Sequence, residues 1–110
     1  MSEFSAETLI ALNKVMGESG QTLPEDSLHA AFASVDYYET VIEQIASIGR
    51  SIMQNHPFVD GNKRTGTFFI LNALAAKGIQ VEKTDDEIID FAVKSVTERW
   101  SVEKIVAWLK

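Results

Sequence analysis

The sequence predicts an all-α fold, a compact single-domain bundle of about six helices over residues 1–110 with at most a short extended segment. Two observations lead to this prediction. Nearly every stretch long enough to assign carries apolar residues at helical spacing, and residues that favour helix ends separate these stretches. The length is also near the common size for one hydrophobic core, and neither a repeat nor a linker interrupts the chain.

The first predicted helix begins at Ser5, a favourable N-cap, and closes at Gly17. Its apolar face consists of Leu9, Leu12 and Met16. A turn segment rich in glycine follows and separates this helix from the next.

Two further helices are predicted before the middle of the chain. A short one begins at Pro24 or Glu25 and ends near Ala33, because proline is favoured at a first helical position. After a polar and aromatic interruption, another begins at Thr40. The apolar residues of this third helix, at helical spacing, are Val41, Ile45, Ile48 and Ile52.

A fourth helix begins at the turn sequence 60–62 and ends at Gly78. It is apolar almost all round, which predicts a central buried helix. The stretch that follows, 79–82, is extended and predicts either a short strand or a connector.

Two helices complete the predicted bundle. The fifth begins at Thr84, which stands in capping-box register with Glu87. The sixth is capped by Ser101.

The charge and composition exclude several classes of protein. The net charge is −6, and nothing supplies the basic face that a nucleic-acid binder needs. The chain has no cysteine, which excludes disulfides and thiol catalysis. The longest apolar run is too short to span a membrane, and the N-terminus lacks the pattern of a signal peptide. We therefore expect a cytoplasmic protein that binds neither nucleic acid nor membrane.

The segment 56–66, "HPFVDGNKRTG", gathers several reactive side chains. His56 precedes a proline, which forces it out of the α-helical region and into an extended segment. It titrates near neutrality and suits the removal of a proton from a hydroxyl. Asp60 is a hard oxygen ligand suited to Mg²⁺.

The same segment predicts an anion site where the fourth helix begins. The backbone amides of Gly61, Asn62, Lys63 and Arg64 belong to its first turn, where the helix dipole favours negative charge. Lys63 and Arg64 can neutralise phosphate oxygens, and Arg64 can do so in a bidentate manner. Base, metal ligand and phosphate cradle together indicate a phosphate-transfer site.

Each residue taken alone has a plainer interpretation. A lone histidine is more often structural than catalytic, and we interpret His29 in this way. A lone Asp-Gly-Asn is usually a turn, and a lone Lys-Arg pair is usually solvated. Their joint order within the segment 56–66 favours the phosphate-transfer site.

The segment resembles the signature of the Fic/Doc family, whose usual form is His-Pro-Phe-x-Asp/Glu-Gly-Asn-Gly-Arg-x-x-Arg. The stretches "SAETLIALN" and "LNALAAKGIQV" on either side also resemble the Doc (death on curing) branch. The family fold is a small all-α domain. Lys63 stands where the usual Fic motif has its second glycine, and Thr67 stands where it has its second arginine. The lysine is the Doc pattern.

The resemblance to Doc implies a toxin kinase that transfers the γ-phosphate of ATP to a threonine of elongation factor Tu and so blocks translation. His56 would activate the target hydroxyl. Asp60 would hold Mg²⁺ or orient that hydroxyl. The phosphate cradle implied by the resemblance consists of Gly61, Asn62, Lys63 and Arg64.

Two alternatives remain open at this point. Gly61 departs from Doc, which has alanine there, and matches Fic, so the chain could be an adenylyltransferase that transfers AMP to a protein hydroxyl. It could also be a catalytically silent Fic-like binding domain. The intact His56, Asp60, Asn62 and Arg64 argue against the silent domain.

The resemblance also implies partners. No glutamate of the chain is followed by glycine or asparagine, as in the inhibitory helix of many Fic proteins. Control by a separate Phd-like antitoxin of a toxin-antitoxin system is therefore expected. Tyr37 and Tyr38 occupy the place of the flap that aligns the target, but packing on the core is an equally good interpretation. We expect Trp100 and Trp108 to lie in the core or in an antitoxin groove.

Overall fold

The computed structural model describes residues 6–15, 32, 35–55 and 62–110, and this part of the chain is all-α. Its elements, in chain order, are α1 (Ala6–Val15), the 3₁₀-helix η1 (Val35–Tyr37), α3 (Val41–Asn55), α4 (Asn62–Ala76), α5 (Asp85–Thr97) and α6 (Val102–Leu109). The all-α prediction is confirmed. The second predicted helix lies outside the described residues except for Phe32, which is part of a turn. The stretch 79–82 is a connector, and the described residues contain no strand.

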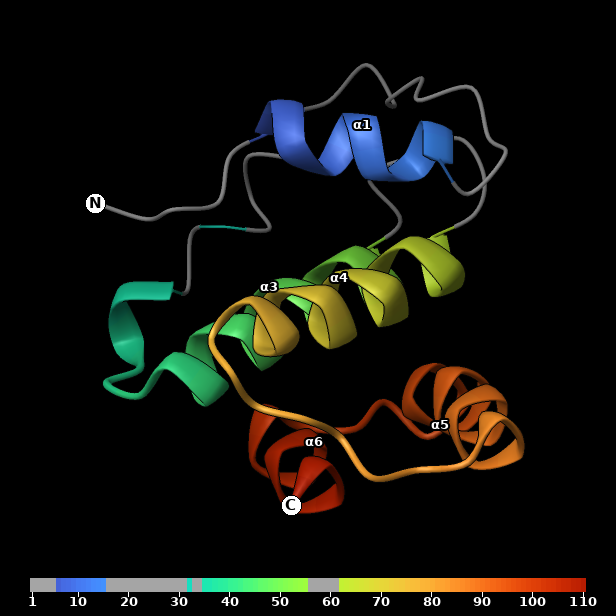
Figure 1. Cartoon of the computed structure of the whole chain (residues 1–110). Helices are drawn as coiled ribbons and strands as arrows, with labels where there is room; N and C mark the ends of the chain where they lie inside the picture. The colour runs from blue at the N-terminus through green and yellow to red at the C-terminus, as the bar shows by residue number, and fades with distance from the viewer. Residues whose placement is uncertain (1–5, 16–31, 33–34, 56–61) are drawn as a thin grey trace.

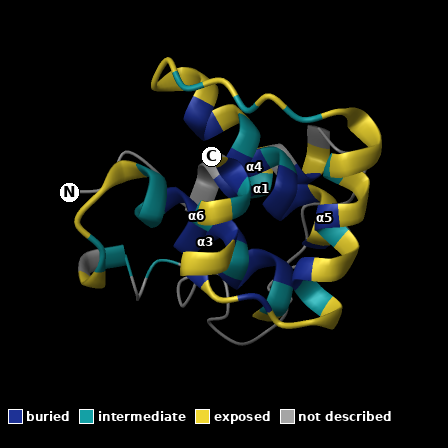
Figure 2. Cartoon of the chain, turned by 90° about the horizontal axis from the view of Figure 1, so that it is seen from below, coloured by how far each residue is buried: buried dark blue, intermediate teal, exposed yellow. Residues whose placement is uncertain are grey.

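The helices form three layers, and the middle layer is a central pair (Figure 1). α3 and α4 lie side by side in the middle, and their mutual contact is the most extensive in the described part of the chain. α1 covers one side of the pair and contacts α4, whereas α5 and α6 lie on the opposite side. Figure 2 shows that the buried residues gather where these helices meet.

α3 begins where its sequence predicts. The Thr40 hydroxyl accepts a hydrogen bond from the Glu43 backbone N–H at 3.2 Å, and the Thr40 N–H donates to the Glu43 carboxylate at 3.2 Å. This is a capping box. Ile45, Ile48 and Ile52 are fully buried, as predicted. Val41 is 42% exposed, because it lies in the first turn, before the helix enters the bundle.

α4 corrects the expectation of a helix that is buried all round. Phe69, Ile70 and Leu74 are buried, but Asn72 and Ala75 are exposed. α4 has α3 on one side, α1 on another and α5 on a third, so a strip of its surface stays open to solvent. Of these two exposed residues only Asn72 is polar, so the sequence marks the strip weakly.

Two glycines allow α3 and α4 to approach closely. A Cβ atom added to Gly66 would lie 2.9 Å from the Gly49 carbonyl oxygen and 2.5 Å from Met53 Cγ. A Cβ added to Gly49 would lie 2.3 Å from Ile70 Cγ1. These separations are shorter than van der Waals contact, so the two backbones meet where neither residue has a side chain.

The turn at Gly78 ends α4 and leads to α5. Gly78 has a φ of 78°, which glycine adopts without strain, and the Ile79 N–H donates to the Leu74 carbonyl at 2.9 Å. α5 then begins at the predicted capping box of Thr84 and Glu87. Ser101 caps α6 by accepting from the Lys104 N–H at 3.1 Å, also as predicted.

Aromatic rings join α5 and α6. Phe91, 2% exposed, stacks on Trp108 at a centroid separation of 4.2 Å and meets Trp100 edge-on at 5.7 Å. Arg50 Nε and Gln54 Nε2 on α3 donate to the Trp100 carbonyl at 2.7 and 3.0 Å. Both tryptophans therefore belong to the core, one of the two places predicted for them.

Glu87 in the capping box gives stability a dependence on pH. Its pKa lies below the usual value of 4.5, because the carboxylate accepts from the Thr84 backbone N–H and the Thr84 hydroxyl. A pKa lowered by folding stabilises the folded state above the unfolded pKa, and this contribution is lost as pH falls through the folded pKa. We expect the urea midpoint of the wild type to exceed that of Glu87→Gln by more at about pH 6 than at about pH 3. A difference that does not vary with pH would contradict this account.

No helix among the described residues combines the length and the apolar character that crossing a bilayer requires.

Candidate functional site

The first turn of α4 has a basic exposed side. α4 begins at Asn62, which is the last residue of the turn sequence 60–62 where its start was predicted. Lys63 and Arg64 are exposed. The positive end of the helix dipole adds to their charge, and the turn therefore favours a bound anion.

The opposite side of this turn is buried and polar. Asn62 is 8% exposed and Thr65 is fully buried. Asn13 of α1, itself 1% exposed, donates from Nδ2 to Thr65 Oγ1 at 2.9 Å. The basic residues thus stand on a turn whose other side is joined to α1.

The residue at the position of the second family arginine faces inward. Thr67 is 7% exposed, and its hydroxyl donates to the Met53 sulfur at 3.5 Å. Ser95 of α5 also approaches this sulfur, at 3.7 Å from its hydroxyl. No charge stands at residue 67, so the basic surface of the described α4 is limited to its first turn.

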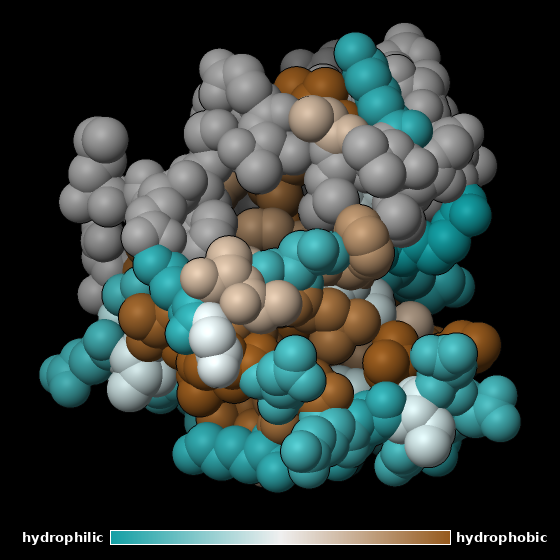
Figure 3. Space-filling view, viewed as in Figure 1, coloured by the Kyte–Doolittle hydropathy of each residue, from teal (hydrophilic) through white to brown (hydrophobic). Residues whose placement is uncertain are grey.

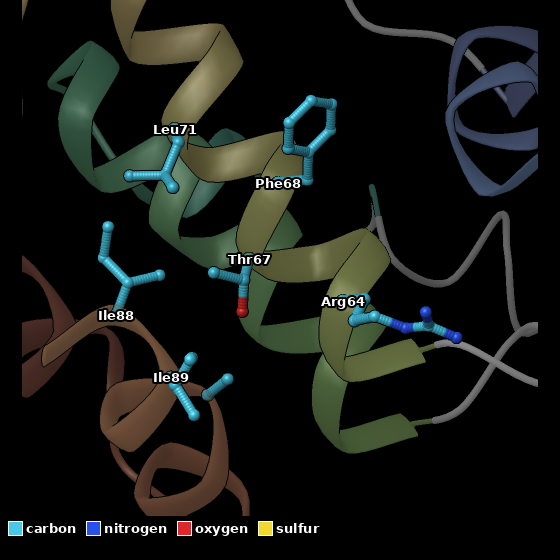
Figure 4. Close-up of a pocket in the computed structure, with 7 residues that line it drawn as sticks. Arg64, Thr67, Phe68, Leu71, Ile88 and Ile89 are labelled. Atoms are coloured by element: carbon cyan, nitrogen blue, oxygen red, sulfur yellow. The ribbon is translucent and has the colours of Figure 1, made fainter. Parts of the chain in front are cut away.

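An apolar pocket of about 220 Å³ lies between α4 and α5 (Figure 4). The residues that line it are Arg64, Thr67, Phe68, Leu71, Ile88, Ile89 and Ala92. Figure 4 shows that the Arg64 guanidinium extends away from Ile88 and Ile89. Arg64 therefore contributes its aliphatic stem to the pocket and directs its charge elsewhere.

The pocket opens on a partly apolar surface. Ile89 and Val93, one helical turn apart on α5, are 63% and 47% exposed. In Figure 3, apolar side chains gather in the middle and lower part of the face shown, with hydrophilic side chains below them and on both sides. An apolar group of a ligand would be accommodated here without burying a protein charge.

The two candidate flap tyrosines differ in their surroundings. Tyr37 is 83% exposed, whereas Tyr38 is half-buried and packs against the core. The Tyr38 carbonyl accepts a hydrogen bond from Gln44 Nε2 at 2.9 Å, which ties it to α3. Tyr38 thus fits the core interpretation, and Tyr37 has the exposure that a flap residue needs.

Several predicted site residues lie outside the described part of the chain. They are His56, Asp60 and Gly61. α3 ends at Asn55 and α4 begins at Asn62, so the described residues reach both ends of this stretch. Among the described residues, no group of three or more histidine, cysteine or carboxylate side chains could hold a metal.

Asn13 and Thr65 were not among the predicted site residues. Asn13 lies four residues after Leu9, at a spacing that predicts the apolar face of the first helix. A polar side chain at a core position needs a buried partner. This spacing was the available signal, but it does not identify the partner, which lies 52 residues further along the chain.

Comparison with known proteins gives a family. A model described as the Fic/DOC family matches residues 3–74, which is more than half of the chain. No curated protein matches the chain. The matched range covers α1, α3 and most of α4, including the basic first turn. The chain therefore belongs to the Fic/DOC family.

Proposed function

We propose that this protein is a Doc-like toxin of a type II toxin-antitoxin system. It transfers the γ-phosphate of ATP to a hydroxyl of a protein target, with elongation factor Tu as the first candidate, and so blocks translation. The observation that carries the proposal is the pair Lys63 and Arg64, exposed on the first turn of α4 in a Fic/DOC chain. A lysine at residue 63 distinguishes the Doc pattern from the usual Fic motif.

The residues of the segment 56–66 take distinct parts in this reaction. The target hydroxyl oxygen attacks the γ-phosphorus, the bond from this phosphorus to the bridging oxygen breaks, and ADP leaves. His56 accepts the proton that the hydroxyl loses. Lys63 and Arg64, with the amides of Gly61 and Asn62, hold the phosphate oxygens and stabilise their negative charge.

Asp60 supplies the carboxylate that would hold Mg²⁺, a hard cation that prefers oxygen ligands. When bound, Mg²⁺ neutralises charge on the phosphate oxygens. The chemistry of the donor set agrees with this, because the segment offers one carboxylate beside two cations and one Mg²⁺ usually takes only one or two carboxylates at a phosphate.

The pocket between α4 and α5 supports a nucleotide rather than free phosphate. Its lining is apolar, and its volume of about 220 Å³ accommodates a flat heterocyclic ring. Arg64 belongs both to the apolar pocket and to the proposed phosphate cradle. Its stem lines the pocket, and its guanidinium extends away from Ile88 and Ile89.

Label transfer tests the proposal. The purified protein, with Mg²⁺ and ATP labelled at either the γ- or the α-phosphate, is incubated with elongation factor Tu and separately with a bacterial lysate. We expect label on protein from the γ-position alone and none from the His56→Ala variant. Label from the α-position would identify an adenylyltransferase, the second candidate, which Gly61 favours because Doc has alanine there. Absence of transfer with retained ATP binding would indicate a silent domain.

Lys63→Gly tests what selects the phosphate. If Lys63 sets the orientation of ATP, the variant should lose γ-phosphate transfer by about 10²-fold, the loss typical of one removed transition-state contact. The measurement is the initial rate of transfer from each label. Lys77→Gly, an exposed substitution just beyond α4, is the matched control for removal of a lysine. Unchanged γ-transfer in Lys63→Gly would contradict the assigned part of Lys63.

The same proposal includes a Phd-like antitoxin as the partner that controls the toxin. Toxicity on expression in bacteria, relieved by His56→Ala, would support the toxin assignment independently of the identity of the target.

A further inference from the structure

The first turn of α4 is attached to the bundle at two points. On one side, Gly66 lies against α3 at the Gly49 carbonyl. On the other side, Asn13 Nδ2 of α1 donates to Thr65 Oγ1 at 2.9 Å. Thr65 stands between Arg64 and Gly66, so both attachments act within one turn of the basic residues.

Burial makes the hydrogen bond between Asn13 and Thr65 specific. Asn13 is 1% exposed and Thr65 is fully buried. A buried amide and a buried hydroxyl are costly to leave without partners, so alternative rotations of the turn that separate these two atoms are disfavoured.

The direction of Thr65 determines the direction of its neighbours. Successive residues of an α-helix are separated by about 100° around its axis, since one turn takes 3.6 residues. If the Thr65 hydroxyl is held toward α1, Lys63 and Arg64 are held in fixed directions on the exposed side of the turn.

We propose that Asn13 and Thr65 are positioning residues that orient the basic first turn of α4 toward the phosphates of ATP. Neither residue touches the anion. The choice of ATP as the ligand rests on the proposed function. Whether α1 holds the first turn of α4 in place can be measured without any ligand.

The experiment compares three single substitutions in the full chain. Thr65→Val removes the hydroxyl and keeps the shape of the side chain. Thr65→Ser keeps the hydroxyl. Ser95→Ala is the matched control, because it removes another fully buried hydroxyl, which lies on α5 and contacts the Met53 sulfur. Thermal unfolding places the three variants on a common scale of stability.

The first measurement is amide hydrogen exchange at residues 66–69, whose N–H groups donate to carbonyls of the first turn in regular helix geometry. We expect exchange there to rise about tenfold more in Thr65→Val than in Ser95→Ala. Without the hydrogen bond to Asn13, the first turn of α4 can open locally, and its amides then exchange without unfolding of the whole protein. Thr65→Ser should behave as the wild type. Equal rises in Thr65→Val and Ser95→Ala would overturn the inference, because the hydrogen bond would then contribute to general stability alone.

The second measurement is the Kd of ATP with Mg²⁺ by titration calorimetry. A misdirected first turn should raise the Kd about tenfold in Thr65→Val and leave it near the wild-type value in Thr65→Ser and Ser95→Ala, a tenfold change being about 1.4 kcal/mol. An unchanged Kd in Thr65→Val would overturn the assignment of these residues to ATP. If the wild type itself fails to bind ATP, the proposed function fails, and the exchange measurement still decides whether α1 holds the turn.

Discussion

Gly66→Ala should lower the free energy of unfolding by about 2 kcal/mol, since overpacking in a well-packed core costs about 1–3 kcal/mol. The added Cβ would lie 2.5 Å from Met53 Cγ and 2.9 Å from the Gly49 carbonyl oxygen. Met53 is fully buried, and the carbonyl belongs to the backbone of α3, so neither atom can move away cheaply. Urea unfolding followed by circular dichroism measures the loss.

The sign of the effect separates packing from helix propensity. In an exposed helix, alanine in place of glycine stabilises by about 1 kcal/mol. A Gly66→Ala variant more stable than the wild type would therefore show that α3 and α4 do not meet closely at this point.

Gly49→Ala tests the same close approach, because the side chain that its Cβ would clash with can be removed by a second substitution. Its Cβ would meet Ile70 Cγ1 at 2.3 Å and Ile70 Cδ1 at 2.4 Å, and Ile70→Ala removes both atoms. In a double-mutant cycle, Gly49→Ala should be destabilising in the wild type and close to neutral in the Ile70→Ala background, a coupling of about 1–3 kcal/mol. Additive effects would contradict the close approach.

Phe91→Ala should lower the free energy of unfolding by about 3–5 kcal/mol, the range for removing a large aromatic side chain from a core. Phe91 is 2% exposed and contacts both Trp100 and Trp108. Its loss leaves a cavity between α5 and α6 and removes two ring contacts. Ile89→Ala on the same helix, 63% exposed, is the control and should cost little.

Two optical probes make this experiment informative about the C-terminal helices, which lie beyond the residues matched by the family model. The chain has two tryptophans, and both contact Phe91, so fluorescence reports on α5 and α6. Circular dichroism reports on all helices. Coincident midpoints would indicate that α5 and α6 unfold together with α3 and α4. Separate midpoints would contradict the predicted single domain over residues 1–110.

The helix boundaries were predictable where they depend on local chemistry. Thr84 with Glu87, Ser101 and Gly78 act on backbone groups a few residues away, so their spacing in the sequence contains the necessary information. The exposure of Val41 and of the open strip on α4 was not predictable, because it depends on which neighbouring helices cover each face.

The candidate site was likewise predictable from the sequence only where it depends on local chemistry. The exposed basic pair Lys63 and Arg64 followed from the motif and from the start of a helix. The hydrogen bond between Asn13 and Thr65 joins residues 52 positions apart, and the pocket joins α4 to α5. Such contacts depend on the tertiary arrangement, which apolar spacing does not specify.

The close approach of Gly49 and Gly66 has a consequence for how the central helices can move relative to each other. Packed helices can move by shear, in which one slides past the other by small adjustments of side-chain rotamers. At this point the contact involves the Gly49 carbonyl, and a backbone atom has no rotamer to change. Sliding of α4 along α3 would force backbone atoms together, so the pair moves as a rigid body.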